Sequence, residues 1–173
     1  DSLKQRVIKH GRRPEHVAIL PGIMPIVGDT DAEAKETLDR LQSFLTPTNA
    51  LTLVSQRIGY DISGYPLDGP IPASREKTDR GKAFSRTFLE MARREKMTLR
   101  DLYNITAAAR GHWVVYGSPK RIADVLEEWF TAERADGFVV MPPYFPGAFD
   151  AFVDKVVPEL QRRGLFRTDY TGP

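Results

Sequence analysis

The sequence predicts an α/β fold in which short parallel strands alternate with helices. Three apolar runs are typical of buried strands: Val17–Leu20, His112–Tyr116 and Phe138–Met141. Glycine, proline or Asp-Gly lies beside each run, and helical periodicity separates the runs, most clearly in residues 31–45 and 119–130. Alternation of strand and helix favours parallel pairing, because a parallel connection needs a crossover segment.

The composition is that of an ordinary globular domain. The chain has 173 residues, of which 41% are hydrophobic and 28% charged. The lack of cysteine excludes disulfides and thiolate sites, and the three histidines lack metal-ligand spacing, so no metal is expected. A net charge of +2 argues against nucleic acid, and no apolar run reaches the ~18 residues of a membrane span. We therefore expect a cytoplasmic protein without a signal peptide.

The first half of the chain carries helix signals and one proline-rich strand region. A helix over residues 2–10 is closed by Gly11, and the Thr30/Glu33 capping box starts a helix over 31–45 that Pro47 ends. A weaker helix is expected at 49–58. Proline at positions 21 and 25 is expected to stop regular strand pairing near Leu20.

The second half of the chain alternates more clearly. Helices are expected at about 82–96 and from Thr98 to about 109. Ser118 and Pro119 suit the cap and first position of the next helix. A last helix begins near Phe149, and Pro158 is expected to kink or end it.

Three strands suggest part of a (β/α)8 barrel. Each βα unit of such a barrel uses about 30 residues, so residues 29–111 would be one large helical insertion within a single domain, 1–173. Three strands cannot close a barrel and leave two open edges, so the sheet is expected to lie against further sequence, a partner or another copy. The chain also opens directly in a helix-like stretch at Asp1, which is typical of a piece of a longer protein.

Several motifs together resemble one family over nearly the whole chain. This family is the flavin-dependent monooxygenases of the nitrilotriacetate monooxygenase component A and dibenzothiophene-sulfone monooxygenase type, within the bacterial luciferase-like superfamily. The Asp61–Pro70 string, combined with the Val156–Leu160 ending, is the most specific part. The motifs are Gly11–Pro14, Leu20–Gly22, Gly28–Ala34, Asp61–Pro70, Gly117–Pro119, Ala135–Phe138 and Val156–Gly164.

The resemblance implies an enzyme that uses reduced FMN and dioxygen to oxygenate a small organic substrate. A separate NAD(P)H-dependent flavin reductase would supply the FMNH2. The three strands would be the last three βα units of the barrel, with the insertion after the first of them. The family's flavin contacts come mostly from upstream segments, so we expect this chain to lack much of the flavin site and to be inactive alone.

Candidate pocket residues follow from the rule that barrel sites lie at the carboxyl ends of strands. This rule points to Met24, Met141 and Tyr144, although methionine packing or a packed loop tyrosine would explain them equally. The glycine- and proline-rich loop 59–82 resembles the insertion that covers the site in this superfamily. Tyr60 and Asp68 are its candidate pocket or lid residues, although Asp68 also suits a turn cap.

Candidate cofactor-binding residues are Ser118, Arg80 and Lys82. Ser118 could offer a hydroxyl and a helix N-terminus to an anion, or it could be only an N-cap. Arg80 and Lys82 could meet the flavin phosphate or an anionic substrate if the loop folds inward, or they could form a solvated charge run. No catalytic residue is predicted.

Two alternatives remain at this level. One is a deazaflavin-dependent oxidoreductase of the same superfamily, which the Leu67–Pro70 string argues against. The other is a non-catalytic fragment that self-associates through its open sheet edges. A homo-oligomer is expected on either view, because barrel strands would otherwise be exposed.

Overall fold

The computed structural model describes residues 2–72, 89–109, 112–170 and 172. It divides into two compact units. The first unit combines residues 1–38 with 112–173, and the second contains residues 39–111. Each unit has its own hydrophobic core.

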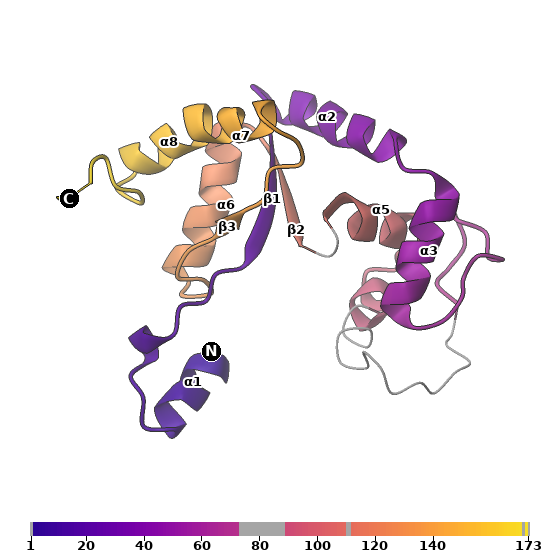
Figure 1. Ribbon diagram of the computed structural model, residues 1–173, viewed down its shortest axis with the longest axis horizontal. Helices are drawn as coiled ribbons and strands as arrows, with labels where there is room; N and C mark the ends of the chain where they lie inside the picture. Colours follow the sequence, from indigo (N-terminus) through magenta and orange to yellow (C-terminus); the bar gives the residue numbers. More distant parts are fainter. Residues whose placement is uncertain (1, 73–88, 110–111, 171, 173) are drawn as a thin grey trace. The chain divides into compact units, whose positions relative to one another are not determined.

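The first unit is built on a three-stranded parallel sheet with the order β2-β1-β3 (Figure 1). β1, Gly22–Val27, is the middle strand. It pairs with β2, Trp113–Gly117, along its length and with β3, Val139–Val140, only at Gly22 and Ile23. The predicted α/β class and the parallel pairing are confirmed.

The strand order corrects one expectation. Successive strands of a (β/α)8 barrel are neighbours, so three successive units would place β2 in the middle. Here β1 lies between β2 and β3. The three strands therefore do not follow one another around a barrel, whereas β1 and β3 are neighbours as successive barrel strands would be.

The predicted strand at Val17–Leu20 is also wrong, because β1 begins only after Pro21. Ile19 exchanges hydrogen bonds with Asp136 instead: its N–H donates to the Asp136 carboxylate at 2.7 Å, and its carbonyl accepts from the Asp136 N–H at 2.9 Å. This exchange ties the segment to a turn rather than to a strand ladder.

Pro25 lies inside β1 without breaking it. The carbonyls of Pro21 and Ile23 accept hydrogen bonds from the N–H groups of Val139 and Met141, so alternate residues of β1 direct their backbone toward β3. Pro25 shares this direction, but β3 has ended at that level. The missing N–H therefore removes no ladder bond, which is why the expectation that proline would stop the pairing fails.

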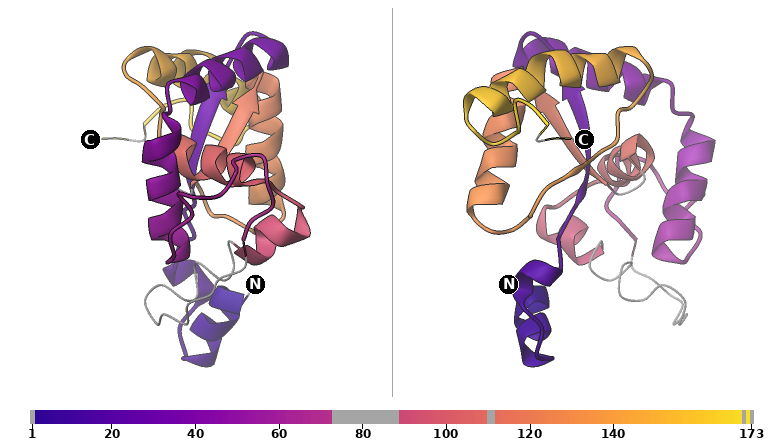
Figure 2. Two further views of the ribbon diagram at one scale, coloured as in Figure 1. Left: turned by 90° about the vertical axis from the view of Figure 1, so that its right-hand side faces the viewer. Right: turned by 60° about the vertical axis from the view of Figure 1, so that its left-hand side comes forward.

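Helices cover one face of this sheet. α6, Pro119–Thr131, carries Ile122, Ala123 and Leu126 into a core with Ile23 and Val115. α7, Gly147–Ala151, continues through a π-helical segment, Phe152–Val156, into α8, Val157–Arg162 (Figure 2). The helix thus passes Pro158, and the residues just before this proline form the π-helical turn in place of the expected kink or end.

The N-terminal part of the first unit holds α1, Ser2–Lys9, and a 3₁₀ turn, Pro14–His16. α2, Asp31–Ser43, begins with the predicted capping box: Glu33 N–H donates to Thr30 Oγ1 at 3.2 Å, while the Glu33 carboxylate accepts from the Asp29 N–H at 2.8 Å. The reach of Glu33 is one residue further back than in the usual box.

The second unit is helical in the part that the structure describes. α3, Pro47–Ile58, has Pro47 at its first position, so this proline starts a helix rather than ending the preceding one. Residues 89–94 are helical, and α5, Leu99–Ala109, follows the predicted Thr98/Asp101 cap, in which the Thr98 N–H donates to Asp101 at 2.9 Å. The core consists of Val54, Ile58, Ile62, Leu89, Ala92, Leu99, Leu102 and Tyr103.

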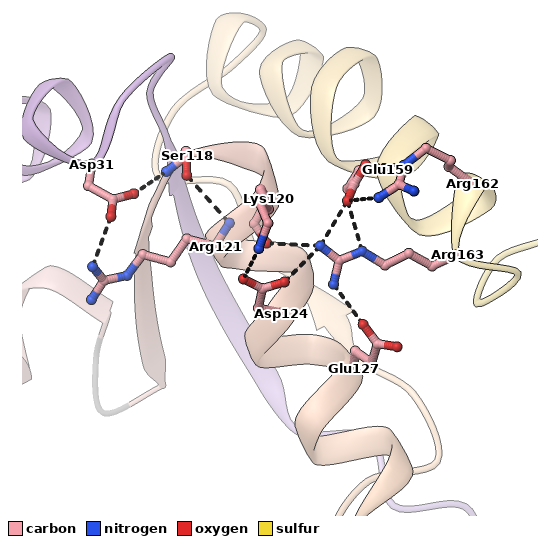
Figure 3. A network of polar contacts seen from close by, with 9 residues as sticks. All are labelled: Asp31, Ser118, Lys120, Arg121, Asp124, Glu127, Glu159, Arg162 and Arg163. Atoms are coloured by element: carbon pink, nitrogen blue, oxygen red, sulfur yellow. Dashed lines mark hydrogen bonds and ion pairs between the residues drawn. The ribbon is translucent and has the colours of Figure 1, made fainter.

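One cation joins α6 to the end of α8 (Figure 3). The Arg163 side chain is only 10% exposed and lies 2.7–2.8 Å from carboxylate oxygens of Asp124, Glu127 and Glu159. Hydrogen bonds from Arg162 and Arg163 lower the pKa of Glu159 to about 2. Three carboxylates around one guanidinium fix the packing of the two helices over the sheet.

We predict that Arg163→Met lowers the free energy of unfolding of this unit by about 2 kcal/mol, because it removes a largely buried charge from paired carboxylates. Both tryptophans, Trp113 and Trp129, lie here, so urea unfolding followed by tryptophan fluorescence reports on this unit. Arg134→Met is the control, since the Arg134–Glu128 pair is more than half exposed and should contribute at most about 0.5 kcal/mol. Equal effects of the two changes would contradict the role given to Arg163.

Candidate functional site

The sheet of the first unit has one face against helices and one face turned away from them. Ile23, Val115 and Val140 pack with α6 and α8. Because side chains alternate along a strand, the residues between them point to the opposite side. We call this side the far face; it consists of Gly22, Met24, Val114, Val139 and Met141.

The predicted pocket methionines meet on the far face. Met24 and Met141 each follow one member of the Ile23–Val140 pair, and Met141 N–H donates to the Ile23 carbonyl at 2.8 Å. The two side chains are therefore neighbours at the same level of β1 and β3, and both are half-buried. Their role as pocket residues stays a prediction.

A histidine that sequence reasoning missed lies at the same place. A Cβ built on Gly22 would be 2.6 Å from Nδ1 of His112 and 3.2 Å from Sδ of Met141. The imidazole ring and the thioether thus fill the space that a side chain at position 22 would take. The histidines were weighed in the sequence only for metal-ligand spacing. The signal for His112 was a glycine at the start of one strand and a histidine just before its parallel neighbour.

Tyr144 follows β3 in the loop that leads to α7. Its side chain is 46% exposed, and its ring edge lies 3.5 Å from where a Cβ of Gly147 would stand. The structure thus places Tyr144 at the carboxyl end of β3, as the barrel rule required, on the surface of its own unit.

Tyr60 and Asp68 lie in the second unit, where both have internal partners. Tyr60 Oη donates to the Pro72 carbonyl at 2.6 Å, and burial raises the pKa of its hydroxyl. Asp68 forms a two-bond ion pair with Arg100, at 2.6 and 3.0 Å, and this hydrogen bonding lowers the pKa of Asp68. These contacts anchor the loop that begins at Gly59 to its own unit. Arg80 and Lys82 lie outside the described residues.

Ser118 caps α6, but an internal carboxylate already occupies the position in front of it (Figure 3). Its backbone N–H donates to Asp31 Oδ1 at 2.8 Å, and Arg121 Nη1 donates to Asp31 Oδ2 at 3.0 Å. The hydrogen bond from the Ser118 N–H is the main cause of the lowered pKa of Asp31. A negative charge here disfavours a second anion, although the cofactor role of Ser118 stays a prediction.

An apolar cavity of about 670 Å³ lies on the helix-covered side of the sheet. Its walls come from α6, β3, the α7–α8 helix and the C-terminal segment. Several large apolar side chains around it are exposed by 40% or more, among them Leu20, Phe130, Phe149, Phe166 and Tyr170. This surface is unusual for a unit that packs alone.

Two absences hold for the described residues. No cluster of three or more acidic or histidine side chains there could hold a metal ion. None of the helices there is long and apolar enough to cross a membrane.

Comparison with known proteins identifies the class. No protein-family model matches the chain. The similarity to individual proteins extends over almost all of it, and all of the relatives compared here are monooxygenases. The chain belongs to the family of flavin-dependent monooxygenases that contains nitrilotriacetate monooxygenase component A and dibenzothiophene-sulfone monooxygenase. The resemblance seen in the sequence is confirmed.

Two relatives and one solved structure define the match. The chain is 42% identical over 173 residues to N-acetyl-S-(2-succino)cysteine monooxygenase of Bacillus subtilis, covering 99% of this chain and 39% of that protein. It is 39% identical over 171 residues to nitrilotriacetate monooxygenase component A of Aminobacter aminovorans, covering 98% and 38%. DmoA from Hyphomicrobium sulfonivorans matches the fold with a TM-score of 0.78 at 27% identity, covering 99% and 35%. The chain thus spans less than two fifths of these relatives.

We predict that Gly117→Ala destabilises the first unit by about 2 kcal/mol. Gly117 has φ +150°, and a Cβ there would lie 2.6 Å from Cδ of Arg121 and 2.9 Å from Oδ1 of Asp31. The change would therefore force apart the ion pair that holds α2 to the start of α6. Gly64→Ala is the matched control, because a Cβ at Gly64 meets no atom within 4 Å.

Thermal unfolding of both variants measures the difference. We expect Gly64→Ala to stay within about 1 kcal/mol of the unchanged chain. A Gly117→Ala variant as stable as this control would contradict the packing described here.

Proposed function

We propose that this chain is part of an FMNH2- and O2-dependent monooxygenase that acts on a small organic substrate. The observation that carries the proposal is the identity of 39–42% with two monooxygenases over 98–99% of the chain. The name of one of them, component A, supports a second component, which we take to be an NAD(P)H-dependent flavin reductase. Because the chain spans less than two fifths of these relatives, the activity belongs to the whole assembly rather than to this chain alone.

In this proposal β1 and β3 are successive strands of a (β/α)8 barrel, α6 and α7–α8 belong to its outer helix layer, and β2 flanks β1 outside the series. The parallel β1–β3 pairing and the helix cover on one face support this arrangement. The far face is then the interior of the barrel. Residues 29–111 are the insertion, and the loop from Gly59 onward is its lid.

The residues of the far face fit the ring system of a flavin better than its phosphate. Met24, Val139 and Met141 form an apolar wall, and Gly22 has no side chain, so a flat aromatic group can approach the backbone. The start of α6 does not fit a phosphate, because Asp31 is already bound there. We therefore leave Ser118 out of the proposed flavin contacts.

When bound, reduced FMN supplies the electrons and the site at which dioxygen is activated. The contribution of this chain is to shape and dry the pocket. The half-buried methionines exclude water from the far face, and the Arg163 cluster holds the helices behind it in place. Tyr144 and the anchored loop from Gly59 to Pro72 then form the rim of the pocket.

A segment exchange tests this function. Replacing the matching 171-residue region of the Aminobacter nitrilotriacetate monooxygenase component A with this chain should keep FMNH2-dependent oxygenation, within about tenfold of the parent, because both would supply the same wall of the barrel. The assay couples the hybrid to a flavin reductase and follows substrate loss.

The control for the exchange is the same hybrid with Arg163→Met, which leaves the far face intact but should lower thermal stability. A folded hybrid with no oxygenation of any substrate of the relatives would contradict the proposed function.

A second candidate, a non-catalytic piece that self-associates, is favoured by the exposed apolar side chains around the 670 Å³ cavity. Light scattering on the isolated chain separates the two candidates when read together with the exchange. Concentration-dependent association combined with an inactive hybrid would favour the second candidate. Association combined with an active hybrid would mean that the cavity surface normally packs within the barrel.

A further inference from the structure

The contact between Gly22, His112 and Met141 points to a specific role for one side chain. His112 lies directly before β2, yet its ring reaches across to the start of β1, where Nδ1 lies 2.6 Å from the position of a Gly22 Cβ. A side-chain atom closer than about 3.0 Å to a Cβ position requires a residue without a Cβ. Only glycine at position 22 therefore leaves room for this ring.

His112 differs chemically from the other side chains of the far face. Gly22, Met24, Val114, Val139 and Met141 offer no strong hydrogen-bond donor, whereas an imidazole always carries at least one N–H. The His112 side chain is exposed, and among the described residues it has no hydrogen-bond or ion-pair partner. His16, in contrast, accepts from Nε of Arg13 at 3.0 Å.

We infer that His112 contacts the substrate and donates a hydrogen bond to one of its oxygen atoms, and that Gly22 is the positioning residue that allows the ring to lie there. The inference rests on the proposed function, since it takes the far face as the pocket wall. A lone donor on an apolar wall fixes the orientation of a ligand, which is the usual division of labour in small-molecule sites. Nitrilotriacetate and N-acetyl-S-(2-succino)cysteine, which appear in the names of two relatives, both carry carboxylates. We therefore assign a carboxylate-bearing substrate to this donor.

The imidazole NMR signals of the chain test the contact. The sequence has three histidines, so the signals of His10, His16 and His112 can be assigned with single substitutions. Titration with nitrilotriacetate should shift the His112 signals and leave those of His10 and His16 unchanged. Such shifts remain measurable when binding is weak, which suits a chain that forms only part of the site.

Substitutions measure the contribution of the donor. His112→Ala should weaken nitrilotriacetate binding about tenfold, the effect of one lost hydrogen bond, with unfolding by urea unchanged. His112→Gln keeps a donor and should restore binding to within about threefold. Equal binding by the unchanged chain and His112→Ala would overturn the substrate contact. Equal weakening by Ala and Gln would mean that ring packing rather than hydrogen bonding matters, and would overturn it as well.

A double-substitution cycle tests Gly22. Gly22→Ala should displace the ring, shift the free His112 signals and weaken binding as much as His112→Ala does. In the His112→Ala background the same change should have no further effect, because the clash with the ring is gone. Gly64→Ala is the control, with no neighbour within 4 Å. Additive losses from the two changes would overturn the positioning role.

The outcomes separate this inference from the proposed function. Binding of nitrilotriacetate that is unaffected by His112 contradicts the inference alone. If the unchanged chain binds no nitrilotriacetate even at millimolar concentration, the substrate contact falls, while the segment exchange still decides the monooxygenase function. The shift of the free His112 signals in Gly22→Ala reports on the packing in every case.

Discussion

The pairing of β1 on both of its edges is the constraint on which the first unit depends. β2 and β3 make no pairing with each other, so both are held in place through β1. The pairing with β3 ends after Ile23, and Pro25 then presents no N–H toward the side that β3 has left. A single strand thus sets the register of the sheet and the level at which its third strand ends.

This register also separates structure from chemistry. One set of alternate residues, including Ile23 and Val115, enters the core beneath α6, and Arg163 closes that layer by joining α6 to α8. The other set faces away from the helices and brings Met24, Met141 and the ring of His112 together. Shifting β1 by one residue would exchange the two sets, so the helix core and the candidate pocket wall are specified by the same hydrogen bonds.

Local signals in the sequence predicted the helices and the α/β class well, because capping boxes and apolar periodicity act within a few residues. They failed where a distant partner decides the outcome. Val17–Leu20 is as apolar as a strand, yet Ile19 bonds to Asp136 instead. Ser118 suited an anion until Asp31, far away in the chain, filled its place. His112 was overlooked because its contact with Gly22 exists only once β1 and β2 pair.

The central claim is that the far face of the sheet is a ligand-binding wall, and methionine methyl NMR tests it most directly. The chain has four methionines: Met24 and Met141 lie on the far face, whereas Met91 and Met97 pack against the core of the second unit. With FMN added at millimolar concentration, the account predicts that the methyl signals of Met24 and Met141 shift together. Unchanged signals from both would contradict it.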